Sequence, residues 1–145
     1  MGQDSASLSA RYRLHLVTRT QGVNVRLMLL MVEVEQPEGI SAHKLILETA
    51  RHNVITAYSG KGAVDLLRRF PNVDLAIVHT ELKGTSFTKT VRQLKVIRPD
   101  LPIVAISPVA DRQVQEVDYM LSSHAPEELL RLLAERFDAA TSDGV

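Results

Sequence analysis

The chain has 145 residues, of which 45% are hydrophobic and 23% charged, a composition typical of one globular domain. Lysine plus arginine equals aspartate plus glutamate at 17 each, so the net charge indicates neither a nucleic-acid nor a membrane partner. With no cysteine there are no disulfides, thiolate metal sites or cysteine nucleophile. No apolar run reaches the roughly 18 residues of a membrane span, and we expect a cytoplasmic protein.

The first 25 residues differ from the rest of the chain. Residues 1–10 are small and polar with no pattern that could bury a face, which predicts disorder. In residues 11–20, Tyr12, Leu14 and Leu16 alternate with polar side chains, the pattern of a half-exposed strand. The sequence leaves two alternatives open: an extra edge strand, or an overextended start outside the domain.

From residue 26 to residue 139, short runs rich in Val, Ile and Leu alternate with segments of helical periodicity. The predicted strands are 26–34, 53–58, 74–79, 102–107 and 117–121. Their nearly continuous hydrophobicity is typical of strands covered on both faces. The predicted helices are 39–51, 60–70, 86–98 and 126–137. Residues 140–145 form a polar tail.

Two of the predicted helices carry recognisable start signals. Ser59 precedes the second helix and could cap it, so we read Gly60-Lys61-Gly62 as a turn and cap rather than a phosphate cradle. Pro126 opens the last helix, in the first turn where proline is tolerated.

Strands alternating with helices predict an α/β fold, with a parallel sheet covered on both faces. In such sheets, ligands and chemistry collect at the carboxyl ends of the strands. The side chains to consider are therefore those that end the predicted strands: Val34, Glu35, His79, Ser107 and Ser122.

Five segments have the order and spacing of one known family: 56–67, 71–78, 98–107, 118–121 and 125–130. Through these segments, residues 26–137 resemble the receiver domains of response regulators. The resemblance implies a flavodoxin-like three-layer α/β/α sandwich with a five-stranded parallel sheet. It also implies a role in bacterial two-component signal transduction, the phosphorelay systems. The family's fourth helix would be shortened, because only residues 108–116 separate the last two strands.

The resemblance also implies where the phosphorylation chemistry should lie. A working receiver needs an acceptor aspartate, two further carboxylates, a divalent metal that is normally Mg²⁺, a hydroxyl and a lysine. With Pro37 as the anchor, Val34 replaces one carboxylate and Glu35 retains the other. His79 occupies the acceptor position. Ser107 retains the hydroxyl, and Ser122 replaces the lysine.

Two further positions matter to this comparison. Tyr119 matches the aromatic residue that changes rotamer in active family members. Strand alternation leads us to expect Glu33 to point away from the pocket. Three of the five functional positions are therefore lost, and we expect no conventional aspartyl phosphorylation.

His79 admits several interpretations. It could accept a phosphoryl group itself, bind Zn²⁺ together with Glu35, or act as the base for a Ser107 nucleophile. We favour a neutral, hydrogen-bonded structural histidine, since two ligands do not make a metal site and no acid orients a catalytic pair. We expect His43, His52 and His124 to be surface residues.

The sequence therefore predicts a pseudo-receiver that acts by protein–protein interaction and is neither an enzyme nor dependent on a cofactor or metal. The expected partner is a signalling protein, with a homodimer as an alternative, and neither nucleic acid nor membrane. Regulation would come from partner binding or from His79 titrating near neutral pH beside Glu35. The alternative function is a receiver that senses a ligand or metal in the altered Glu35/His79 pocket.

Overall fold

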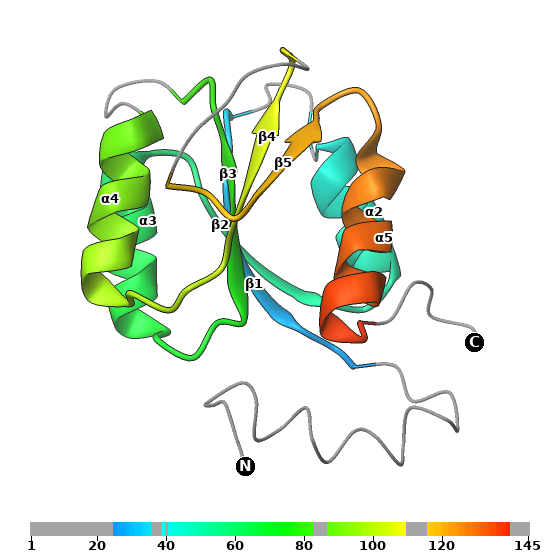
Figure 1. The fold of residues 1–145 in the computed structure, drawn as a ribbon, viewed down its shortest axis with the longest axis horizontal. Helices are drawn as coiled ribbons and strands as arrows, with labels where there is room; N and C mark the ends of the chain where they lie inside the picture. Colours follow the sequence, from blue (N-terminus) through cyan, green and yellow to red (C-terminus); the bar gives the residue numbers. More distant parts are fainter. Residues whose placement is uncertain (1–24, 36–38, 40, 83–86, 110–115, 140–145) are drawn as a thin grey trace.

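A computed structural model describes residues 25–35, 39, 41–82, 87–109 and 116–139. Five parallel strands form one sheet in the order β2-β1-β3-β4-β5. In Figure 1 this sheet lies between helices on its two sides. The strands are β1 (Met28–Val32), β2 (Asn53–Ala57), β3 (Leu75–His79), β4 (Ile103–Ser107) and β5 (Tyr119–Ser122). The helices are α2 (Ala42–Thr49), α3 (Gly60–Arg69), α4 (Phe87–Ile97) and α5 (Pro126–Phe137). The predicted flavodoxin-like three-layer fold is confirmed.

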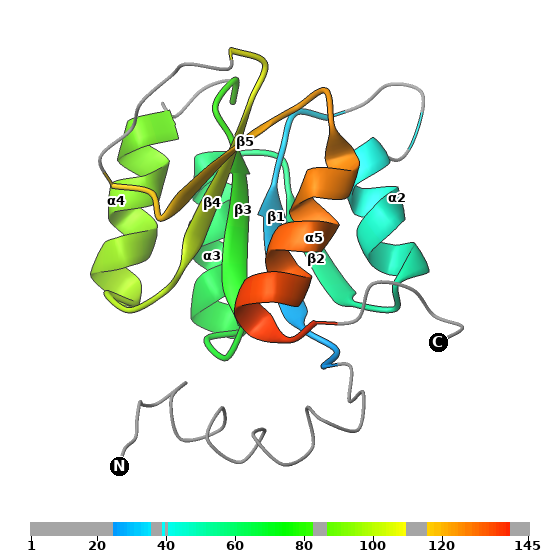
Figure 2. The same cartoon turned by 45° about the vertical axis from the view of Figure 1, so that its right-hand side comes forward.

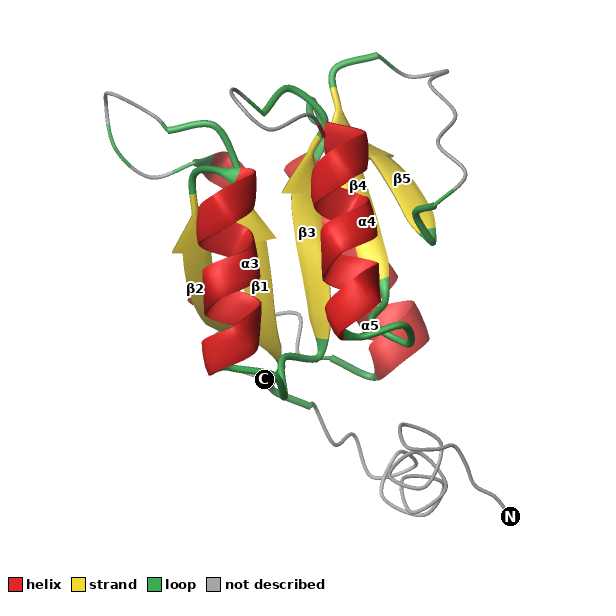
Figure 3. Ribbon diagram, turned by 90° about the vertical axis from the view of Figure 1, so that its left-hand side faces the viewer, coloured by secondary structure: helices red, strands yellow, loops and turns green. Residues whose placement is uncertain are grey.

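The four helices cover both faces of the sheet. Helices α3 and α4 pack on one face, as Figure 3 shows, and α2 and α5 lie beside each other on the other, as Figure 2 shows. Each face of the sheet has its own hydrophobic core, and the residues of each strand point alternately into one core and the other. In β1, Leu30 and Val32 join the α3/α4 core, whereas Leu29 and Met31 join the α2/α5 core. This alternation decides which side chains meet at the strand ends.

Local signals explain where the helices begin and end. The hydroxyls of Ser41 and Ser59 accept hydrogen bonds from the amides of Lys44 and Gly62, at 3.1 Å and 3.0 Å. Each bond satisfies one of the free amides in a first helical turn, so Ser59 caps α3 as predicted. Helix α5 has the predicted bounds, and the next residue, Asp138, caps its end in a left-handed conformation with φ of 54°.

Two aspartates join neighbouring strands at the amino edge of the sheet. Asp74 precedes β3, and its carboxylate accepts a hydrogen bond from the amide of Met28, the first residue of β1, at 2.8 Å. Asp118 precedes β5 and binds the amide of Ile103, the first residue of β4, also at 2.8 Å. The amides of both aspartates donate back to the carbonyls of the same two residues. Each aspartate thus pairs both polar backbone groups at the start of a neighbouring strand.

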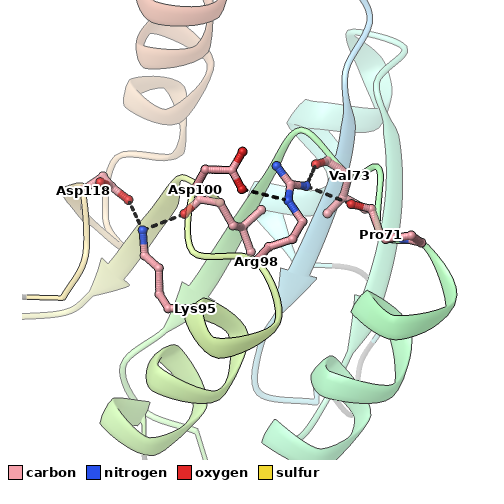
Figure 4. A network of polar contacts seen from close by, with 7 residues as sticks. Pro71, Val73, Lys95, Arg98, Asp100 and Asp118 are labelled. Carbon is pink, nitrogen blue, oxygen red and sulfur yellow. Dashed lines mark hydrogen bonds and ion pairs between the residues drawn. The ribbon is translucent and has the colours of Figure 1, made fainter. Parts of the chain in front are cut away.

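Two basic residues extend this network, as Figure 4 shows. Lys95 binds the carbonyl of Leu101 at 2.7 Å and the carboxylate of Asp118 at 3.2 Å. Arg98 donates to the carbonyls of Pro71 and Val73. These contacts connect the end of α4 with the loops that enter β3, β4 and β5.

Some expectations fall outside the described residues. They are the disorder of residues 1–10, the strand within 11–20, the polar tail at 140–145 and most of the segment that would hold the shortened fourth helix. Val25, the first described residue, pairs with Ala139 beyond the end of α5. None of the helices in the described ranges is both long and apolar enough to cross a membrane.

Candidate functional site

Glu33 and His79 lie next to each other at the carboxyl edge of the sheet. Strands β1 and β3 are neighbours, with Val32 opposite Val78, so the residues that follow these two are also adjacent. Glu33 continues the series of Leu29 and Met31 on the α2/α5 face. The distance from Glu33 Oε1 to His79 Nε2 is 4.0 Å. Our expectation that Glu33 points away from the pocket was wrong.

The side chain of His43, a residue of α2, lies beside His79. Its side chain is buried, and its ring meets that of His79 edge to face, with centroids 5.8 Å apart. Glu33 is buried as well and is only 2% exposed. These three residues, which we call the Glu33–His43–His79 cluster, come from β1, α2 and β3.

Burial controls the protonation of the cluster. It raises the pKa of Glu33, although a hydrogen bond with the Ser41 side chain and the charge of Lys44 act in the opposite direction. It lowers the pKa of His79 to about 4, with a further decrease from His43 and an opposing effect of Glu81. His79 is therefore neutral at neutral pH, and the expected titration of its ring near pH 7 is wrong.

Burial also lowers the pKa of His43. The carboxylate of Glu127 and a hydrogen bond with the backbone of Ser122 partly offset this decrease. Both rings of the cluster therefore favour the neutral form, which carries one nitrogen lone pair available to a proton or an ion.

Of the other predicted site residues, Ser122 contacts this cluster through its backbone, which is hydrogen-bonded to His43. Val34 is half-buried and Glu35 is exposed. The hydroxyl of Ser107 is turned back onto its own loop, where it accepts a hydrogen bond from the amide of Val109 at 3.0 Å. The hydroxyl of Ser122 accepts one from the amide of His124 at 3.0 Å. The structure therefore pairs His79 with Glu33, whereas sequence reasoning paired it with Glu35 or Ser107.

Strand alternation explains the separation of Ser107 from His79. Ser107 continues the series of Ile103 and Ala105, which serve the α3/α4 core, whereas His79 continues that of Leu75 and Ile77 on the other face. A hydroxyl and an imidazole on opposite faces of a sheet do not form a nucleophile–base pair. Nothing in this geometry favours the hydrolase interpretation.

Tyr119 lies on the α2/α5 side of the sheet. Its ring packs against the α2/α5 core, and the guanidinium carbon of Arg136 lies 6.0 Å from its centroid. This distance allows a cation–π contact between β5 and α5. The proposed switch aromatic therefore has a specific partner on the adjacent helix.

Two of the histidines expected at the surface are buried. His43 and His52 are each 4% exposed, whereas His124 is exposed as expected. His52 accepts a hydrogen bond on Nδ1 from the amide of Leu27 at 3.0 Å, which gives it a structural role. For His43 the sequence did hold a signal: it precedes the buried Leu47 by four residues, so both lie on one face of α2.

Solved structures with the same fold are receiver domains. A CheY-like response regulator receiver domain protein from Methanospirillum hungatei JF-1 shares 18% identity and a TM-score of 0.63, over 79% of this chain and 95% of that one. The N-terminal domain of a response regulator/sensory box/GGDEF 3-domain protein from Carboxydothermus hydrogenoformans shares 24% identity and a TM-score of 0.60, over 74% and 90%. This chain has the receiver-domain fold.

A third solved structure with a similar fold contains a metal ion. The receiver domain of a sensor histidine kinase from Pseudomonas aeruginosa PAO1 holds a magnesium ion in its active site cleft. It shares 18% identity and a TM-score of 0.68, over 79% of this chain and all of that one. No protein-family model and no curated protein sequence matches the chain significantly.

The Glu33–His43–His79 cluster does not suit Mg²⁺. That ion takes oxygen ligands in near-octahedral geometry at 2.0–2.1 Å. Here the buried carboxylate is Glu33, and its neighbours His43 and His79 offer nitrogen. In the ranges that the structure describes, no three acidic or imidazole side chains are already placed to hold a metal ion together.

Proposed function

We propose that this chain is a cytoplasmic pseudo-receiver, which acts in bacterial two-component-type signalling by binding another protein without aspartyl phosphorylation. The observation that carries the proposal is His79. It ends β3, where the resemblance places the acceptor aspartate, and an imidazole cannot form the acyl phosphate that an aspartate forms. The fold alone does not establish function, so the signalling role rests on family analogy.

The surroundings of His79 support a pocket that does not switch. The lysine position is Ser122, whose hydroxyl binds the amide of His124, and the Ser107 hydroxyl is engaged with Val109. The exposed Glu35 is not the carboxylate beside His79, which is Glu33. The site therefore has neither an aspartate to accept a phosphoryl group nor the lysine that would bind that group in a working receiver.

The surface offers a protein partner an apolar contact. A hollow of about 340 Å³ between α2 and α5 is lined by Ala42, Leu45, Ile46, Thr49, Pro126 and Glu127. Leu45 is 54% exposed there. An exposed leucine beside an apolar hollow is the kind of surface that supports a protein-interaction role.

The phosphorylation half of the proposal is tested with acetyl phosphate and Mg²⁺. We expect no gain of a phosphoryl group by intact mass spectrometry, and no change in melting temperature with Mg²⁺ and beryllofluoride. A receiver domain that retains all five functional residues serves as the positive control. A phosphoryl adduct of any kind on this chain would contradict the proposal.

The interaction half is tested by site-specific photo-crosslinking in cells. A crosslinker at Leu45 is compared with one at Asp65, an exposed polar residue of α3, on the opposite layer. We expect a discrete adduct from Leu45 whose partner, identified by mass spectrometry, belongs to a signalling system, and none from Asp65. A second copy of this chain would identify the homodimer, and no adduct at either position would contradict the interaction role.

A further inference from the structure

The Glu33–His43–His79 cluster concentrates buried polar atoms that have no partner. In the described part of the chain, four buried side-chain atoms lack a hydrogen bond, and three of them belong to this cluster: Glu33 Oε1, His43 Nε2 and His79 Nε2. An unpaired buried polar group destabilises a fold, because it has given up its hydrogen bonds with water without gaining others. Three such atoms contributed by three adjacent side chains point to a ligand that satisfies them together.

The chemistry of these atoms defines the class of ligand. Two imidazole nitrogens and one carboxylate oxygen are the ligands of Zn²⁺ and of related divalent transition metals, which accept nitrogen readily. Mg²⁺ would require oxygen in place of both rings. The two rings come from α2 and β3, so an ion would connect a helix with the edge of the sheet.

Neighbouring groups already orient two members of the cluster. The side chain of Ser41 is hydrogen-bonded to Glu33, and the backbone of Ser122 is hydrogen-bonded to His43. Hydrogen bonds of this kind fix the orientation of metal-ligating carboxylates and histidines in known sites. Here they leave one oxygen of Glu33 and one nitrogen of His43 unpaired.

We propose that Glu33, His43 and His79 bind one divalent transition-metal ion of the zinc class, with a water or a partner's side chain as the fourth ligand. Glu33 Oε1 and His79 Nε2 are 4.0 Å apart, against about 3.3 Å for two ligand atoms on one tetrahedral zinc ion. The Glu33–His79 pair is therefore within about 1 Å of its spacing in a formed site. The three side chains are not already placed around one point, so binding also requires the ring of His43, 5.8 Å from that of His79 between centroids, to turn toward the ion. This site does not depend on the proposed interaction role and would exist if that role failed.

The first experiment measures binding to the full chain after removal of metals with a chelator. Calorimetric titration with Zn²⁺ should give one equivalent, and Co²⁺ should develop the intense visible bands of a tetrahedral site. Mg²⁺ should give neither heat nor a rise in melting temperature. No saturable binding of Zn²⁺ or Co²⁺ would overturn the proposal.

Variants then locate the ion. His79→Asn, His43→Asn and Glu33→Gln should each weaken Co²⁺ binding by more than the roughly 10- to 100-fold that loss of an outer-shell partner causes. His124→Asn, at an exposed histidine outside the cluster, is the matched control and should leave both affinity and spectrum unchanged. Loss of binding in a control but not in the cluster variants would mean an adventitious ion only, and would overturn the assignment.

A measurement on the unaltered chain covers the case in which a cluster variant does not fold. Zn²⁺ should shift the imidazole proton signals of His43 and His79 in the nuclear magnetic resonance spectrum, and Co²⁺ should broaden them. The signals of His52 and His124 should change least. The reverse pattern would place the ion elsewhere and would refute the site.

Discussion

The rings of His43 and His79 meet edge to face, with their planes at 89° and their centroids 5.8 Å apart. At this distance a proton on one ring disfavours a proton on the other, and His43 does lower the pKa of His79. The relationship joins α2 to the end of β3, so the protonation of the cluster is coupled to the packing of that helix.

In the absence of a bound ion, His79 should titrate far below an ordinary histidine. We expect a pKa of about 4 for its ring, because burial disfavours the charged form. Histidine ring signals followed against pH by nuclear magnetic resonance measure this directly. A midpoint near 6.5, the value of an unburied histidine, would mean that the ring is solvated and would contradict the prediction.

The free energy of unfolding should fall as the pH is lowered from about 6.5 to about 4. The unfolded chain takes up a proton on His79 in this window, whereas the folded chain, with its lowered pKa, does not. The loss from His79 amounts to roughly 3 kcal/mol, and His43 acts in the same direction. Urea denaturation at several pH values measures it.

Glu33→Gln should make the free energy of unfolding fall more steeply as the pH is lowered. The raised pKa of Glu33 means that the folded chain takes up this proton before the unfolded chain does as the pH falls. That uptake stabilises the folded state at low pH and is lost as the pH rises through the folded pKa. The same urea series on the variant shows the difference, and an unchanged slope would mean that Glu33 titrates normally.

His79→Asp should destabilise the fold by about 1–3 kcal/mol at neutral pH, because it places a second carboxylate beside the buried Glu33. Adding Glu33→Gln removes one of the two charges and should restore part of the loss. The four proteins form a double-mutant cycle, with denaturation midpoints as the readout. Strictly additive effects would show that the two positions do not interact.

Asp118→Ala should cost about 1.5 kcal/mol, the lower end of the range for a hydrogen bond to a charged group, because its side chain is 43% exposed. Its carboxylate binds the amide of Ile103 and the ammonium group of Lys95. Asp100→Ala is the matched control, because that carboxylate is largely exposed and contacts Arg98 at 3.5 Å. We expect the control to change stability by less than about 0.5 kcal/mol, and equal losses in the two variants would contradict the assignment.

His52→Ala should leave the buried amide of Leu27 without its hydrogen-bond acceptor and cost about 1–3 kcal/mol. Hydrogen exchange at the Leu27 amide should accelerate in parallel. His124→Ala, at an exposed histidine, should leave stability within about 0.5 kcal/mol. An unprotected Leu27 amide in the unaltered chain would rule out the bond.

The elements could be predicted from sequence where their ends carry a local signal. Helix α5 has the predicted bounds because Pro126 is compatible only with a first turn. Strand β1 is shorter than predicted, since the apolar run extends beyond the residues that pair with both β2 and β3. The length of β1 depends on where β2 and β3 lie beside it, and the sequence of β1 alone does not contain that information.

The Glu33–His43–His79 cluster could be predicted only in part. The position of His79 follows from the end of a strand, and the alternation of Leu29, Met31 and Glu33 would have placed the carboxylate on the same face as His79. The position of His43 beside these two residues depends on how α2 packs on the sheet, which is a tertiary relationship. Proximity of three residues from separate elements therefore required the structure.

The aspartates at the amino edge of the sheet have a consequence for how such a protein evolves. Asp74 and Asp118 fix the strand starts at the edge opposite to the Glu33–His43–His79 cluster. The residues that fix the strand starts and the residues at the carboxyl edge are then separate sets. Substitutions at the carboxyl edge can change its chemistry while the contacts that set the register of the sheet are kept.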